Sequence, residues 1–160
     1  MKVLGVDPGL KATGYAVLEY QNRKTRVLEA GAINLKPSRP IPERVEKIYR
    51  DLNELVTQYQ PRVLVLEKLY SHSKYVTTAS ILGHARGVIC LVASQNQLEF
   101  AEYSVKRIRK AVVGNGSASK VQTRKILGQL LNIDESKLTL DASDALALAL
   151  GHVQIQGRNL

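Results

Sequence analysis

The stretch KVLGVDPG, residues 2–9, is a short apolar strand that ends in a carboxylate, Asp7, and is stopped at once by a proline and a glycine. Residues 13–20 and 25–35 have the same strand-like composition and are separated by a turn around Asn22. Three strands joined by such short connections predict an antiparallel meander. The first part of the chain is therefore expected to begin a sheet, with Asp7 at the carboxyl end of its first strand.

The remainder of the chain alternates between helix and strand patterns. Apolar residues recur at three- and four-residue steps over 42–60, which predicts a helix that Pro61 ends. The apolar run RVLVL at 62–66 is typical of a central strand covered on both faces. Further helices are expected at about 76–95, from 104, near 119–131 and from Leu140, with a strand near 98–103. We predict an α/β fold: a five-stranded mixed sheet, meander plus parallel strands, with helices on both faces.

The chain is expected to form one domain over residues 1–156, followed by a short carboxyl-terminal tail at 157–160. Gly83 and Gly87 lie four residues apart in the expected helix at 76–95, where small residues permit the close approach of another helix. The single cysteine, Cys90, has apolar neighbours, and we expect it to pack in the core.

Four carboxylates are predicted to meet at one end of the sheet. The first and fourth strands should run parallel, so Asp7 and Glu67 at their carboxyl ends would lie about 4.8 Å apart if these strands pair. Asp141 and Asp144 stand at i and i+3 at the start of the last helix and share one face. Each pair also has a purely structural explanation, because acids often end strands at solvent and aspartates cap the first turn of a helix.

Taken together, the four acids favour a metal site. Neighbouring carboxylates repel one another unless cations neutralise them, and hard divalent ions, magnesium above all, prefer oxygen ligands. Two such ions about 4 Å apart would clamp a scissile phosphate, so the predicted reaction is phosphodiester hydrolysis.

The charge of the chain agrees with a polyanionic substrate. The net charge is +9, and residues 68–133 hold ten bases against two acids. A solvated helix face remains the alternative explanation of this basic segment. No signal peptide or run of eighteen apolar residues is present, and we expect a soluble cytoplasmic protein that does not enter a membrane.

An ordered series of motifs spans nearly the whole chain: GVDPG at 5–9, TGY at 13–15, LE at 66–67, ARG at 85–87, VVGNGSASK at 112–120 and DASDA at 141–145. The series resembles the bacterial RuvC Holliday junction resolvases of the RNase H-like superfamily. The resemblance implies an endodeoxyribonuclease that resolves four-way DNA junctions by paired symmetric nicks, in homologous recombination and DNA repair. It further implies a homodimer with the helix at 76–95 at its two-fold interface, and RuvA and RuvB as partners.

The resemblance also assigns roles to residues. It implies that Asp7, Glu67, Asp141 and Asp144 are the catalytic, metal-binding carboxylates, with two Mg²⁺ per subunit and Mn²⁺ as a substitute. Lys120 would lie near the cleaved phosphate, Arg109 occupies a position where lysine is more usual, and Tyr70 stands where an aromatic residue stacks on bases. With the surrounding basic residues, the expected DNA contacts are Tyr70, Lys74, Lys106, Arg107, Arg109, Lys110, Lys120 and Arg124.

Three alternatives remain open at this point. The motif at residues 5–14 also resembles the first phosphate loop of actin-like ATPases and sugar kinases, although those folds need two lobes and 160 residues provide one. A junction-binding protein without catalysis would keep the basic segment, but all four acids are present. A related nuclease acting on RNA–DNA hybrids is not excluded by four acids.

Overall fold

The computed structural model describes residues 1–9, 11–68 and 76–157. In chain order the strands are β1 (Lys2–Asp7), β2 (Ala12–Gln21), β3 (Lys24–Asn34), β4 (Val63–Glu67) and β5 (Glu99–Tyr103). The helices are α1 (Ile41–Tyr59), α2 (Val76–Gln95), α3 (Val105–Val113), α4 (Lys120–Leu131) and α5 (Leu140–Gly157), with a 3₁₀ turn, η2 (Glu135–Lys137), before α5. These bounds match the predicted elements closely.

The five strands form one mixed sheet in the order β3-β2-β1-β4-β5. β1, β2 and β3 pair antiparallel as a meander, whereas β1 pairs with β4, and β4 with β5, in parallel. β4 is buried from Val63 to Leu66, as predicted for a strand covered on both faces. The fold class and the parallel pairing of β1 and β4 are thus confirmed.

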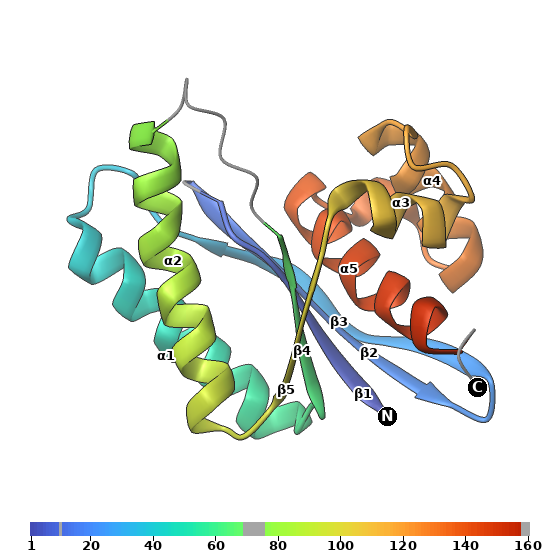
Figure 1. The fold of residues 1–160 in the computed structure, drawn as a ribbon, viewed down its shortest axis with the longest axis horizontal. Coiled ribbons are helices and arrows are strands. Elements are labelled where there is room, and N and C mark those ends of the chain that lie inside the picture. The colour runs from blue at the N-terminus through green and yellow to red at the C-terminus, as the bar shows by residue number, and fades with distance from the viewer. Residues whose placement is uncertain (10, 69–75, 158–160) are drawn as a thin grey trace.

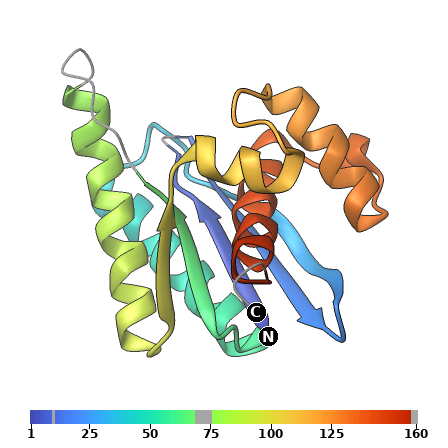
Figure 2. The same cartoon turned by 45° about the vertical axis from the view of Figure 1, so that its right-hand side comes forward.

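Helices cover both faces of this sheet, with α1 and α2 on one side and α3, α4 and α5 on the other (Figure 1). Two separate clusters of buried apolar residues fill the two interfaces. α5 is buried almost throughout, from Ala145 to Val153, because it lies between the sheet on one side and α3 and α4 on the other (Figure 2). An alanine- and leucine-rich helix with no polar stripe is the composition that such a position requires.

Two expectations about α2 need comment. Cys90 is exposed, so the prediction that it packs in the core was wrong; its apolar neighbours Ile89 and Val92 face the core, and Cys90 lies on the other side of the helix. Gly83 and Gly87 also face open space, because an added Cβ at either would have no described atom within 4 Å. At the carboxyl terminus α5 includes Gly157, the first residue of the expected tail, and residues 158–160 lie outside the described part.

Candidate active site

Two of the four acids are positioned by the sheet. The parallel register of β1 and β4 sets Asp7 beside Glu67 at the carboxyl ends of the two strands. Side chains alternate between the faces of a strand, and Val3 and Val65 pack in the core beside α5. Asp7 and Glu67 lie an even number of residues further along, so both point to the α5 face of the sheet.

The other two acids arrive on α5, which lies unusually close to β1 and β2. An added Cβ at Gly14 would overlap the backbone oxygen of Asp141, and one at Gly5 would overlap that of Ala145. Glycine is required at both positions because any side chain would push the helix away from the sheet. This contact sets Asp141, in the first turn of α5, and Asp144, in the next turn, above the ends of the strands.

The start of α5 is capped by a residue other than its aspartates. Thr139 accepts a hydrogen bond from the amide of Ala142 through its Oγ1, at 3.1 Å, and one from the amide of Ser143 through its backbone oxygen, at 3.0 Å. Thr139 thus caps the first turn of α5, so neither Asp141 nor Asp144 is needed as the capping residue.

The four carboxylates interact electrostatically. Burial, followed by the negative charges of Glu67, Asp144 and Asp141, raises the pKa of Asp7 to about 7, against the opposing charge of Lys120. Burial, followed by the charge of Asp144, also raises the pKa of Glu67. All four acids predicted from the sequence therefore belong to one cluster.

Two basic residues oppose this repulsion. Lys120, the first residue of α4, pairs with Oδ2 of Asp144, and this hydrogen bond raises the pKa of the lysine. Ser119 caps α4 and forms a capping box with Gln122, which fixes the helix start and so directs Lys120 at the cluster. Arg109 on α3 is close enough for its charge to lower the pKa of Glu67. Both basic residues thus lie beside the acids, and their contact with the cleaved strand stays a prediction.

The donor set suits a hard divalent ion, since it consists of carboxylate oxygens whose mutual repulsion a cation would relieve. Among the described residues, however, no three acid, histidine or cysteine side chains are arranged as a ready metal-binding group. The ammonium of Lys120 supplies the positive charge in this arrangement, and its pairing with Asp144 turns that carboxylate toward α4. The four acids lie close together, but in this arrangement their carboxylates are not directed at one common point.

Arg86 is a functional candidate that the sequence analysis quoted in a motif without giving it a role. Its guanidinium donates to the backbone oxygen of Glu67 through Nη1 and pairs with Glu102 on β5 through Nη2. Its side chain is only 16% exposed. The signal was available, because Arg86 is the only charged residue of α2, a helix otherwise free of Asp, Glu, Lys and Arg.

The remaining residues predicted to contact DNA differ in exposure and in their hydrogen-bond partners. Lys106, Arg107 and Lys110 are exposed on α3, and the Arg107 guanidinium lies 5.2 Å from the centre of the Tyr103 ring. The guanidinium of Arg124 instead donates to the backbone oxygen of Glu135, at 2.8 Å from Nε, and so holds η2 against α4. Tyr70 and Lys74 lie outside the described residues. These assignments stay predictions.

Comparison with known proteins decides the family. A family model described as crossover junction endodeoxyribonuclease RuvC matches residues 3–152. The chain belongs to the RuvC family. The RuvC of Alkaliphilus metalliredigens is 38% identical over 152 residues, which cover 95% of this chain and 92% of that protein. The RuvC of Halothermothrix orenii is 40% identical over 152 residues with the same two coverages.

Solved structures agree with this assignment. Thermus thermophilus RuvC superposes with a TM-score of 0.90 at 25% identity, over 99% of this chain and 97% of that one. A second structure of that RuvC, in complex with Holliday junction substrate, has a TM-score of 0.91 at the same identity. The yeast mitochondrial Holliday junction resolvase Ydc2 shares the fold, with a TM-score of 0.74 at 16% identity. Membership of the RuvC family selects a crossover junction endodeoxyribonuclease over the nucleotide-binding lobe that the first motif also resembled.

Proposed function

We propose that this chain resolves four-way DNA junctions by paired symmetric nicks, as a magnesium-dependent nuclease whose catalytic residues are Asp7, Glu67, Asp141 and Asp144. The observation that carries the proposal is the electrostatic coupling of these acids: the negative charges of Glu67, Asp144 and Asp141 all raise the pKa of Asp7. Family membership and the junction bound by the Thermus thermophilus relative support the substrate.

The protein's own residues divide the work at this site. Asp7, Glu67, Asp141 and Asp144 would hold the divalent ions, and the bound metal would supply an activated water and stabilisation of the leaving oxygen of a phosphodiester. Arg86 holds the backbone of Glu67, so that the carboxylate of Glu67 starts from a fixed position. Lys120 and Arg109 offset the negative charge beside the scissile phosphate and attract it. We expect two Mg²⁺ per subunit, with Mn²⁺ as a substitute.

The four carboxylates of the proposed site belong to a chain that is otherwise strongly basic. Outside the four carboxylates the chain has 23 bases and ten acids, a balance of +13. The proposed contacts on α3 are Lys106, Arg107, Arg109 and Lys110; Lys120, Arg124, Tyr70 and Lys74 complete the predicted set. Binding to phosphates releases counterions from the DNA, and this release becomes less favourable as salt is added, so binding should weaken steeply with added salt.

We further propose that the active form is a homodimer, since two symmetric nicks require two identical sites. The exposed side of α2 supports this, because Gly83 and Gly87 face open space and Cys90 and Leu91 are exposed there. The part of the chain that the structure describes contains no helix long and apolar enough to cross a bilayer. By family resemblance, the dimer would act with RuvA and RuvB in the cytoplasm, as a single domain over residues 1–156.

The deciding experiment uses a synthetic four-way junction with magnesium. We expect paired symmetric nicks from the parent protein, and loss of cutting with retained binding for Asp7→Asn. Linear duplex DNA and an RNA–DNA hybrid of the same sequence serve as substrate controls. Preferential cutting of the hybrid, or junction binding without any cutting by the parent, would contradict the proposal.

A further inference from the structure

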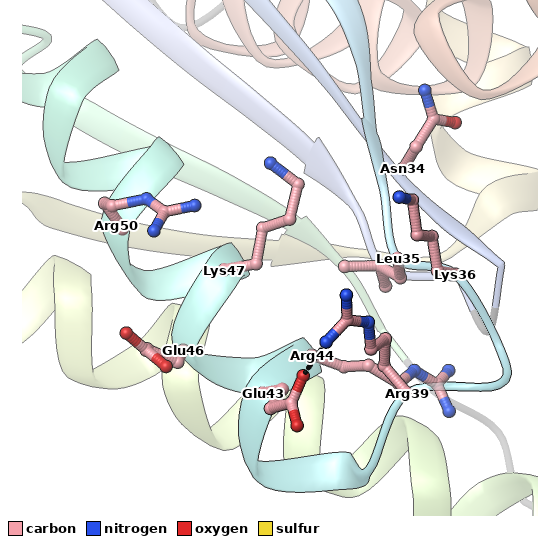
Figure 3. A pocket seen from close by; sticks show the side chains of 9 residues that line it. All are labelled: Asn34, Leu35, Lys36, Arg39, Glu43, Arg44, Glu46, Lys47 and Arg50. Atoms are coloured by element: carbon pink, nitrogen blue, oxygen red, sulfur yellow. Dashed lines mark hydrogen bonds and ion pairs between the residues drawn. The ribbon is translucent and has the colours of Figure 1, made fainter.

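A second basic surface lies away from the carboxylate site, on the opposite face of the sheet. It is a hollow of about 400 Å³ between the end of β3, the loop that follows and the first half of α1 (Figure 3). Five of its nine lining residues are cationic and two are acidic, so the hollow has a balance of +3; the cations are Lys36, Arg39, Arg44, Lys47 and Arg50. We name this group the α1 hollow.

The cations are brought together by helix spacing and by the loop. Arg44, Lys47 and Arg50 follow one another at three-residue steps on α1 and therefore share one side of it. The loop adds Lys36 and Arg39 from the facing wall. In Figure 3 the amino groups of Lys36 and Lys47 extend into the space between α1 and the end of β3.

Three of these cations keep positive charge available to a ligand, whereas Lys47 pairs with Asp51 at 2.6 Å. Lys36 is exposed and forms no ion pair with any residue that the structure describes. Arg39 pairs with Glu43 at 2.9 Å, but the two side chains are 60% and 49% exposed, so the pair contributes little. Arg50 is 59% exposed and 3.5 Å from Asp51. A guanidinium has five donors and can contact an anion while keeping such a partner.

The α1 hollow opens at the same end of the sheet as the carboxylates. The register pairs Asp7 with Gly14 and Gly14 with Ala32, two strand spacings or about 10 Å away. The hollow begins at Asn34, two residues beyond Ala32. The acids point to the α5 face, whereas α1 covers the other face, so the hollow and the site lie on opposite sides of one edge.

We propose that the α1 hollow binds backbone phosphates of a junction arm, beyond the strand that is cut. Long, exposed basic side chains around an open hollow suit a polyanion's backbone, because they contact phosphates without reading bases. The inference rests on the proposed function, since it takes the junction's arm as its ligand. The hollow therefore adds affinity and orients the arm, while the carboxylates alone perform the chemistry.

The test compares two triple variants of equal charge. Lys36→Gln, Arg39→Gln and Arg50→Gln remove charge from the hollow; Arg23→Gln, Lys24→Gln and Arg62→Gln remove the same charge at the opposite end of the sheet. The hollow set breaks the ion pairs of Arg39 with Glu43 and of Arg50 with Asp51, and the control set breaks that of Arg62 with Glu99. Thermal unfolding verifies that both variants are folded.

Junction affinity is then measured over a range of salt concentrations, with long and with trimmed arms. On long arms we expect the hollow variant to bind roughly tenfold more weakly than the matched control, and its slope of log affinity against log salt to fall by about 0.9 per lost phosphate. On trimmed arms the two variants should bind alike. Equal slopes on long arms, or a loss that persists on trimmed arms, would overturn the inference; a parent protein that binds no junction would instead overturn the proposed function.

Discussion

Arg86 on α2 holds the backbone oxygen of Glu67 at the end of β4, while its other nitrogen pairs with Glu102 on the neighbouring strand β5. One partly buried guanidinium thus joins two adjacent strand ends and the helix that covers them. Glu67 is a proposed metal-binding residue. By fixing its backbone, Arg86 helps to determine the position of its carboxylate. We regard Arg86 as a positioning residue, since its contact is with the backbone of Glu67.

Arg86→Gln should impair cleavage more than junction binding. Loss of partners behind metal-binding residues typically costs 10–100-fold in activity or metal affinity, and we expect a decrease in that range. The magnesium concentration for half-maximal cleavage should rise as well, which a merely structural role would not produce in a folded variant. Arg62→Gln, which breaks an exposed pair with Glu99, is the control. An unchanged magnesium dependence in Arg86→Gln would contradict the positioning role.

Gly14→Ala should destabilise the fold because its Cβ would overlap the backbone oxygen of Asp141. Backbone cannot move aside as a side chain does, so the free energy of unfolding should fall by about 1–3 kcal/mol or more. Displacement of α5 would also carry away Asp141 and Asp144, and cleavage should be lost with stability. Denaturant unfolding measures the effect. Gly157→Ala is the control, because a Cβ there meets no described atom within 4 Å.

Stability without divalent ions should depend on the ionisation of Asp7. Its pKa of about 7 lies above the ordinary 3.8, so the folded protein retains a proton that the unfolded chain loses as pH rises. Stability therefore decreases between about pH 4 and pH 7, by on the order of 4 kcal/mol. Asp7→Asn cannot ionise, so it should match the parent near pH 4 and exceed it at pH 8.

Denaturant unfolding in a chelator at several pH values measures this difference. Magnesium at pH 8 should then stabilise the parent more than Asp7→Asn, because binding to the folded state adds to its stability. Parallel curves of unfolding free energy against pH for the two proteins would show that ionisation of Asp7 does not cause the loss of stability.

Lys120→Gln should shift the pH profile of cleavage upward. The lysine's charge opposes the rise in the pKa values of Asp7 and Glu67, so its removal lets both pKa values increase further. Cleavage that requires ionised carboxylates would then begin at higher pH, with a lower maximum rate. Lys120→Arg should keep the profile near that of the parent because it keeps the charge. Lys125→Gln, an exposed change on the same helix, is the matched control.

Cys90 offers a direct measure of association through α2. Because it is exposed in the single chain, a thiol reagent should modify it readily at low protein concentration. Its reactivity should fall as concentration rises if a second copy covers this side of α2. Leu91→Glu, at a position 47% exposed, should keep Cys90 reactive at all concentrations. Concentration-independent reactivity in the parent would contradict the proposed dimer face.

The sequence predicted most of the fold because strand and helix periodicity, with Pro61 and the glycine-containing turns as boundaries, are local signals. It also placed Asp7 and Glu67 together, since strand direction alone determines which ends meet. It was wrong about Cys90 because α2 is apolar on several sides, and composition does not tell which side faces the sheet. The single charge of Arg86 in an otherwise uncharged helix was a signal in the sequence, but its partner, a backbone oxygen nineteen residues away, was not.

The α1 hollow was missed for a related reason. The loop residues and the helix residues that line it are each unremarkable as charged surface positions, and only the packing of α1 against the end of β3 makes them face one another. Long-range arrangement, which no local pattern encodes, created both of the features that the sequence left undetected.

The four carboxylates come from the first strand, the fourth strand and the last helix, and this order has a consequence during synthesis. A growing chain that ends anywhere before α5 carries at most half of the four acids and lacks the helix that fills one side of its sheet. Such a chain cannot assemble the cutting centre. The nuclease therefore stays inactive during synthesis until α5 has been made and packed on the sheet, because only then are all four acids present.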